Sequence, residues 1–232
     1  MAISNFDGNT FVAFMDISGF KEFMKQNNKA WEALDILYTY GYRTLSEQND
    51  RIGFKVEGIF ISDCGVLFIK NNEDDRNTID ELTQLLKVIR TINQKMVDND
   101  FMLTTSIAYG HFKYQERIEF PGIEKNPIYG SAYVSAFLDN ENGTPKIQPG
   151  QCRIIKRNLP TEINANFQNE RDFETNNVLD LIRAKDRDNG HYYFYWNIQN
   201  RNEIDNFERH YNDSYNLKFS GMLKALKGIR NI

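Results

Sequence analysis

The segment TFVAFMDISGFKEFMKQ (residues 10–26) joins two different patterns at a single acidic residue. Residues 10–16 carry an apolar, β-branched and aromatic run, which is typical of a strand that is covered on both faces. Asp16 ends this run, and a helical pattern begins after the Ser18–Gly19 step. A carboxylate at the end of a buried strand is costly unless it is paired, so Asp16 predicts a partner or a function at this position.

The composition fits one globular domain. The chain has 232 residues, of which 41% are hydrophobic and 13% aromatic, enough for a sizeable core. Its 28 basic and 32 acidic residues leave a formal charge of −4, which argues against a broad nucleic-acid-binding surface. Cys64 and Cys152 match no metal-binding spacing and favour a reduced, cytoplasmic protein. No leader pattern and no apolar run of about 18 residues is present, so we expect no membrane segment.

The hydrophobic periodicity predicts an α+β fold around one sheet. Beyond the first strand it predicts helices at 18–27 and 29–48, a hairpin of 53–61 and 65–70, a helix at 80–97, a second strand pair of 101–110 and 111–120 turning at Gly110, a short helix from Ser131, a strand at 151–156, another at 190–198 and a helical region at 203–230. Up to residue 156 the order is β-α-α-β-β-α-β-β-α-β. This is close to a ferredoxin-like βαββαβ sheet with helices on one face, plus an extra helix and hairpin.

A second acid, Asp63, lies in the predicted turn of the first hairpin. In this topology the first strand lies beside that hairpin, so Asp16 and Asp63 are expected to converge at one end of the sheet. Two ionised carboxylates about 4 Å apart repel each other by roughly 4 kcal/mol at an effective dielectric near 20. A divalent cation between them removes this repulsion, and Mg²⁺ or Mn²⁺ favours one or two carboxylates together with water and phosphate.

The loop after Asp16 supplies the complementary half of such a site. The backbone amides of Ser18, Gly19 and Phe20 would open a helix and point at an anion, and Gly19 has no Cβ to block its approach. A metal pair beside a helix N-terminus predicts a triphosphate site. The plainer alternatives are that Asp16 only caps the helix and that Asp63 is an ordinary turn residue.

These motifs resemble those of class III nucleotidyl cyclases. FVAFMDISGF (11–20) is similar to their first metal motif and KVEGIFISDCGVLF (55–68) to their second, and TTSIAYGHFKY (104–114), IYGSAYVSAFL (128–138) and PGQCRIIK (149–156) follow in the family's order. The resemblance covers about residues 10–157. It implies a cyclase-like catalytic domain over residues 1–157, with residues 158–232 an extension that completes the same domain. It also implies a homodimer with active sites at its interface.

The resemblance assigns roles to the acid pair and its neighbours. Asp16 and Asp63 become the catalytic residues that hold two divalent cations, Mn²⁺ or Mg²⁺, with help from the Ile17 carbonyl. The loop of residues 18–20 binds the phosphates. The attacking group is then the ribose 3′-hydroxyl of a nucleoside triphosphate, and pyrophosphate leaves.

Departures from the family pattern bear on the base. The two purine-selecting positions fall on Ile59 and Pro127, and neither side chain makes the polar contacts that a purine edge requires. A two-residue gap would instead place Glu57 at the first of them. Ser62-Asp63 in place of Gly-Asp is more similar to the bacterial pyrimidine cyclases of Pycsar antiphage defence. Those enzymes make the 3′,5′-cyclic monophosphate of UTP or CTP, which activates a separate effector protein, and UTP is favoured here.

A second departure affects catalysis. The family's transition-state Asn and Arg fall on Val134 and Leu138, which cannot stabilise a developing phosphoryl charge. Lys113, Arg117 and Arg153 are candidate replacements from neighbouring strands. An inactive homologue that binds nucleotide as a regulatory module, a purine cyclase, and a non-enzymatic interaction domain on a ferredoxin-like sheet remain the alternatives.

Overall fold

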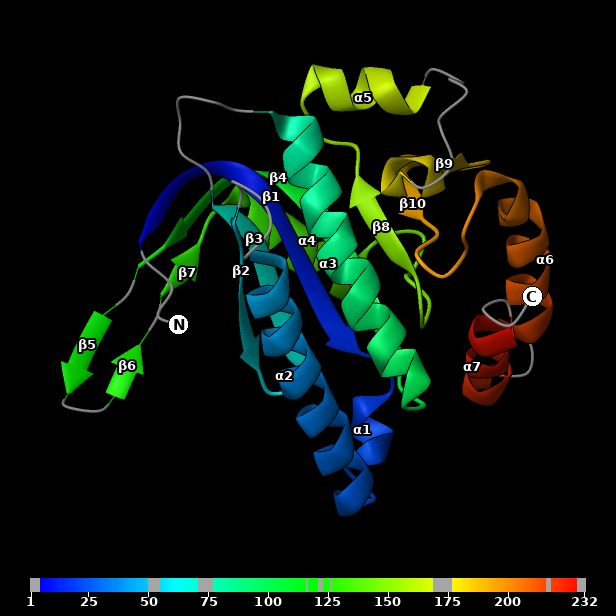
Figure 1. Ribbon diagram of the computed structural model, residues 1–232, viewed down its shortest axis with the longest axis horizontal. Coiled ribbons are helices and arrows are strands. Elements are labelled where there is room, and N and C mark those ends of the chain that lie inside the picture. Colours follow the sequence, from blue (N-terminus) through cyan, green and yellow to red (C-terminus); the bar gives the residue numbers. More distant parts are fainter. Residues whose placement is uncertain are drawn as a thin grey trace.

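The computed structural model describes residues 5–49, 55–70, 77–115, 117–120, 123–125, 127–168, 177–215 and 218–228. Its main sheet has the strand order β2-β3-β1-β4-β8-β10-β9, with β7 paired to the end of β4 (Figure 1). The strands are β1 (Phe6–Ile17), β2 (Lys55–Ile61), β3 (Cys64–Lys70), β4 (Leu103–Tyr114), β7 (Ile128–Tyr129), β8 (Cys152–Ile155), β9 (Ile182–Lys185) and β10 (Asp188–Phe194). Strand β8 runs parallel to β4, and the other pairings are antiparallel.

Strand β1 is buried within the molecule because both of its faces are covered. Phe11, Met15 and Ile17 face the larger hydrophobic core, whereas Val12 and Phe14 belong to a second, smaller core on the opposite face. Each fully buried side chain of this kind contributes about 1.5–3 kcal/mol, which explains why residues 11–15 of β1 have no polar face in sequence. As predicted, β1 lies beside the first hairpin, between β3 and β4.

The helices form two unequal layers. Helices α2 (Asn27–Asn49) and α3 (Thr78–Asp98) cover the larger core, and Figure 1 shows them side by side in front of β1. Helix α4 (Ser131–Asn142) packs on β1 and β4 from the other face, over the smaller core. The remaining helices are α1 (Phe20–Phe23), α5 (Thr161–Gln168), α6 (Ile204–Tyr215) and α7 (Lys218–Gly228), with 3₁₀ turns at Val178–Leu181 and Arg201–Glu203.

The predicted α+β sheet is confirmed, but two local predictions are wrong. Strand β4 runs without interruption through Gly110, which pairs with Thr10, so no hairpin turns there. A Cβ at Gly110 would lie 2.8 Å from the Ser131 hydroxyl, so the glycine serves the close approach of α4. A separate hairpin, β5 (Arg117–Phe120) and β6 (Ile123–Lys125), follows instead.

The second difference concerns a helix: the one predicted at 18–27 shrinks to the single turn α1. The predicted helical region at 203–230 is confirmed, as the two helices α6 and α7. Strands β9 and β10 of the region beyond residue 157 extend the main sheet. None of the helices in the described ranges combines the length and hydrophobicity that crossing a membrane requires.

Candidate functional site

Asp16 and Asp63 lie together at one end of the sheet. Asp16 is the penultimate residue of β1, opposite Cys64 in β3 and Thr104 in β4. Asp63 occupies the short turn between β2 and β3, and its carbonyl accepts a 2.9 Å hydrogen bond from the Ile17 amide, which ties the turn to the end of β1. The Ser62 hydroxyl donates to the Asp63 carboxylate at 3.0 Å. The structure therefore brings the two predicted acids to one place.

The carboxyl group of Asp16 has a strongly raised pKa. Burial raises its pKa to about 7, and the charges of Asp63 and Glu141 add to the increase, whereas Lys21 opposes it. The neighbouring Cys64 thiol has its pKa raised to about 11, first by burial and then by Asp63 and Asp16. This end of the sheet is a partly buried region of negative charge, as expected where a cation is to be bound.

The alternative that Asp16 caps a helix is wrong. The N-cap of α1 is Gly19, which has a left-handed backbone (φ 78°), and no side chain makes a capping hydrogen bond there. Asp16 instead belongs to the β1 ladder with β3 and β4. The alternative that Asp63 is a turn residue agrees with its place between β2 and β3.

The predicted phosphate loop is only partly free to bind an anion. The Ser18 amide donates to the Met102 carbonyl at 2.8 Å, so it is already used, while Gly19 and Phe20 begin the single turn α1. Phe219 of α7 supports this loop from behind, since its ring lies 3.9 Å from where a Gly19 Cβ would be and edge-on to Phe23, with 5.8 Å between the centroids. The C-terminal helix therefore packs directly against the candidate site.

The last turn of α4 forms a polar rim that sequence reasoning missed. Thr104, the β4 partner of Asp16, donates its hydroxyl to the Asn140 side-chain oxygen at 3.1 Å. Glu141 follows, and its charge contributes to the raised pKa of Asp16. The run DNEN at residues 139–142 was the available signal, but acidic and amide residues at a helix end are usually solvated.

The two proposed base-pocket residues are not brought together within one chain. Ile59 lies opposite Val66 in β3, near the acids, and on the same sheet face as Asp16. Pro127 accepts a hydrogen bond from the Gln115 amide, just beyond the far end of β4. Ile59 lies in the same row across the sheet as Ser106 of β4. Gln115 comes nine residues after Ser106, so at 3.3 Å per residue the positions of Ile59 and Pro127 are about 30 Å apart along the strand direction. Glu57 is on the same face as Ile59 and is ion-paired with Lys55.

Two of the candidate replacement cations are wrong. Lys113 is ion-paired with Asp7 at the beginning of β1, the opposite end from Asp16. Arg153 is fully buried, and its guanidinium is bound to Asp139. The Arg117 side chain lies outside the described part of the structure. Val134 and Leu138, where the family carries its polar pair, are 48% and 50% exposed on α4.

The raised pKa of Asp16 predicts how the free energy of unfolding of the metal-free protein depends on pH. Because the folded-state pKa is about 7 and the usual value is 3.8, the folded chain keeps a proton that the unfolded chain releases as the pH rises between these values. Stability contributed by this group is therefore lost from about pH 4 to pH 7. We expect Asp16→Asn to raise the free energy of unfolding by on the order of 2 kcal/mol at pH 8, after allowance for partial solvent screening, and to change it little at pH 4. Urea denaturation in EDTA at both pH values measures this, and an equal effect at both would contradict the assignment.

Comparison with known proteins identifies the fold. No protein-family model and no curated protein matches the chain. Among solved structures, a dimeric guanylyl cyclase domain of the RhoGC fusion protein from the aquatic fungus Blastocladiella emersonii matches with a TM-score of 0.56 and 11% identity, over 83% of this chain and 96% of that one. The catalytic core of a rhodopsin-guanylyl cyclase with converted specificity, in complex with ATPαS, matches with a TM-score of 0.55 and 12% identity, over 83% and 97%. The guanylyl cyclase Cya2 matches with a TM-score of 0.50 and 13% identity, over 82% and 93%. The chain thus has the fold of a class III nucleotidyl cyclase catalytic domain.

Proposed function

We propose that this chain is a nucleotidyl cyclase that converts a pyrimidine nucleoside triphosphate, UTP ahead of CTP, to its 3′,5′-cyclic monophosphate and pyrophosphate. One observation carries the proposal: on a cyclase fold, the two acids of the resembling motifs lie together at the end of β1 and in the β2–β3 turn. The burial and mutual repulsion that raise the pKa of Asp16 support a cation-binding role for the pair.

The acid pair fits Mg²⁺ or Mn²⁺. These ions accept one or two carboxylates and take their remaining ligands from water and phosphate, so Asp16, Asp63 and the Ile17 carbonyl suffice on the protein side. Within the described ranges no three His, Cys, Asp or Glu side chains converge on a metal position, and the proposal assigns the remaining metal ligands to water and the substrate phosphates. When bound, two such cations supply a lowered pKa of the ribose 3′-hydroxyl and charge stabilisation at the phosphates.

The chain's own contribution is to bind and orient the nucleotide. The Gly19 and Phe20 amides at the start of α1 are proposed to donate to the terminal phosphates, and Gly19 leaves room for their approach. Helix α7 keeps this loop in place through Phe219. Positioning and charge stabilisation account for most of the barrier reduction in phosphoryl transfer, so little acid–base chemistry is required of the side chains.

The proposed preference for a pyrimidine rests on the sheet face beside the acids. Ile59 is the partly buried member of a row in which Val66 and Phe14 are buried beneath α4, so it is the member of this row that a base could contact. Its side chain offers no hydrogen bond to the purine edge that the family recognises at this position. The similarity of Ser62-Asp63 to the Pycsar enzymes points the same way. The same resemblance carries the proposal that the product is a messenger of antiphage defence, read by a separate effector protein.

The exposed apolar residues near the site support a homodimer. Val134, Phe137 and Leu138 on α4 form what we call the α4 apolar patch. Contiguous exposed apolar side chains of this kind usually mark an interaction surface. The proposed occupant is a second copy of the chain, as in the family that the sequence resembles.

Leu138→Asp tests this surface. A charge in a buried dimer interface is strongly disfavoured, so we expect the variant to be monomeric at concentrations where the unchanged protein is dimeric, with at least a hundredfold loss of turnover. Sedimentation velocity and product formation measure the two effects. Trp31→Asp, at an exposed apolar residue of α2, is the matched control. A dimeric and active Leu138→Asp protein would contradict this placement of the interface.

An inactive homologue is the second candidate function. Val134 and Leu138 favour it, because neither side chain replaces the polar pair that stabilises the transition state, and the described basic residues Lys113 and Arg153 do not compensate for them. Such a protein would bind a nucleotide with its metals as a regulatory module and not turn it over.

Incubation of the purified protein with UTP, CTP, ATP and GTP separately in Mn²⁺, with products resolved by mass, tests the function. We expect a cyclic pyrimidine nucleotide that disappears in Asp16→Ala and Asp63→Ala proteins. A cyclic purine would contradict the assigned base preference. Metal-dependent nucleotide binding without product would favour the inactive homologue, and no metal-dependent binding would favour a non-enzymatic domain.

A further inference from the structure

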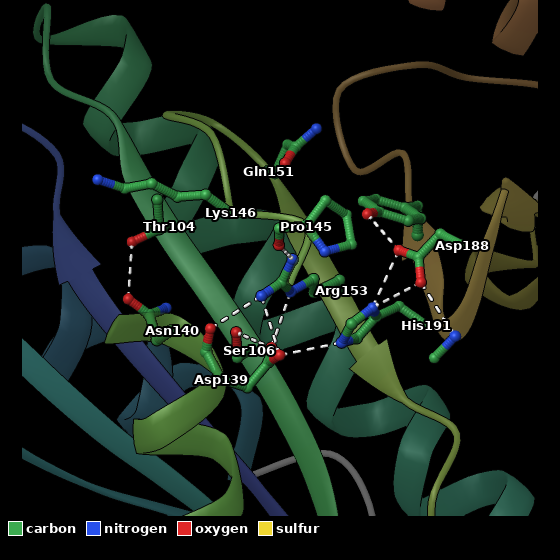
Figure 2. A network of polar contacts seen from close by, with 12 residues as sticks. Thr104, Ser106, Asp139, Asn140, Pro145, Lys146, Gln151, Arg153, Asp188 and His191 are labelled. Atoms are coloured by element: carbon green, nitrogen blue, oxygen red, sulfur yellow. Dashed lines mark hydrogen bonds and ion pairs between the residues drawn. The ribbon is translucent and has the colours of Figure 1, made fainter. Parts of the chain in front are cut away.

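A buried polar network lies next to the candidate site and joins four elements of the fold (Figure 2). Its centre is Asp139, in the last turn of α4. Fully buried Arg153 of β8 donates to both carboxylate oxygens of Asp139, at 2.7 and 2.9 Å, and to its backbone carbonyl at 2.8 Å. The Ser106 hydroxyl of β4 donates to the same carboxylate at 2.7 Å. His191 of β10 contacts it through Nε2, at 2.9 Å.

The other side of His191 extends the network into β10. Its Nδ1 lies 2.9 Å from both carboxylate oxygens of Asp188, which also accepts from the Tyr193 hydroxyl at 2.7 Å and from the Gly190 amide at 3.0 Å. The imidazole ring thus bridges the carboxyl groups of Asp139 and Asp188, with one nitrogen on each.

The network consists of directional hydrogen bonds and ion pairs, and these affect the pKa of Asp139. Burial acts to raise the pKa of Asp139, but the hydrogen bonds from His191, Arg153 and Ser106 outweigh it and hold the pKa below its usual value. The Arg153 guanidinium also donates to the Pro145 carbonyl at 2.5 Å, beyond the end of α4. Side chains of β4, β8 and β10 thus bind the last turn of α4, and that of β8 also binds the loop after it. We call this set the α4 clamp: Ser106, Asp139, Arg153, Asp188 and His191.

The residues that follow Asp139 in α4 connect the clamp to the candidate metal site. Asn140 follows Asp139 and accepts from Thr104, the residue opposite Asp16 in the β1–β4 ladder. Glu141 comes next, and its charge acts on Asp16. A shift of the last turn of α4 therefore changes both the polar rim of the site and the electrostatic environment of Asp16.

We propose that Asp139 is a positioning residue for the metal site, and that His191 and Asp188 couple this position to the C-terminal strand β10. This gives a role to part of the region beyond residue 157, for which the sequence suggested none. The proposal rests on the proposed function, because it names what the clamp positions. It requires no contact between the clamp and the nucleotide.

Two variants test the proposal on the full chain. Asp139→Asn weakens the centre of the clamp but leaves Arg153 without its anion, so some of it can fail to fold. His191→Gln is the second variant, because it keeps the Arg153–Asp139 pair and removes the imidazole that joins Asp139 to Asp188. Asp205→Asn is the matched control, since Asp205 pairs with Arg183 at the surface, where it is 75% exposed.

The first readout is amide hydrogen exchange, which requires no activity. We expect His191→Gln to speed exchange at least tenfold in residues 138–142, with α3 unchanged. The second is Mn²⁺ affinity, measured from free Mn²⁺ by electron paramagnetic resonance. We expect the Mn²⁺ affinity to be three- to tenfold weaker in both clamp variants and to be unchanged in Asp205→Asn.

Each outcome separates the clamp from the proposed function. Unchanged exchange at 138–142 would overturn the clamp. Faster exchange with Mn²⁺ affinity within 1.5-fold of the unchanged protein would overturn the positioning role. If the unchanged protein bound no Mn²⁺, or if Asp16→Asn bound it equally well, the proposed function would fail and the positioning role with it, while the exchange result would still decide whether the clamp holds α4.

Discussion

Asp63→Asn is expected to lower cyclase turnover by on the order of 10³-fold or more while the protein remains folded. Asparagine has the same shape as aspartate and suits a turn, and the backbone carbonyl that accepts from Ile17 is unaffected. The Ser62 hydroxyl can still donate to the remaining side-chain oxygen. The substitution thus removes the negative charge that a divalent cation requires and little else.

Turnover of the variant is measured in Mn²⁺ with the preferred nucleotide, beside circular dichroism to confirm the fold. Asp205→Asn is the control, because it removes an equivalent charge from an exposed ion pair. We expect that control to keep full activity. Activity of Asp63→Asn within tenfold of the unchanged protein would show that the β2–β3 turn does not hold the catalytic metal.

Arg153→Met is expected to have the largest effect on stability. Its guanidinium lies in the α4 clamp with a side chain that is 0% exposed, between the carboxylate of Asp139 and the carbonyl of Pro145. Methionine fills similar volume but leaves Asp139 with one positive partner fewer in a buried position. Removal of one member of a buried ion pair costs about 3–5 kcal/mol.

Arg183→Met provides the comparison, since Arg183 is ion-paired with Asp205 where its side chain is 46% exposed. Exposed pairs contribute about 0–1 kcal/mol. Urea denaturation at pH 7 gives the free energy of unfolding of both proteins. A loss of less than about 1 kcal/mol in Arg153→Met would contradict the buried, fully bonded environment described for this residue.

The parts of the fold that were predictable are those in which local pattern and tertiary environment agree. Strand β1 is apolar at successive positions because α2 and α3 cover one face and α4 the other, so its burial is visible in sequence. Gly110 misled the prediction because a glycine in a β-rich segment usually marks a turn. Here the glycine is needed inside a strand, where Ser131 approaches too closely for a Cβ.

The candidate site, like the fold, was predictable only in part. Asp16 and Asp63 were predictable because each ends or joins a strand and the topology makes those strands neighbours. The clamp was not predictable, because Asp139, Arg153 and His191 come from three separate elements and have the residue types of a solvated surface. Arg153 was considered as a free cation for the nucleotide, although its partner stands 14 residues earlier in the chain. Only the fold shows that its charge is already used.

The most direct test of the acid pair as a metal site is Mn²⁺ binding, followed by electron paramagnetic resonance with and without UTP. The unchanged protein, Asp16→Asn and Asp63→Asn are titrated under the same conditions at pH 7.5. We predict that the unchanged protein binds Mn²⁺, that UTP tightens the binding because its phosphates complete the metal ligands, and that each substitution weakens it at least tenfold. Equal Mn²⁺ binding by all three proteins would contradict the assignment of Asp16 and Asp63 as the metal site.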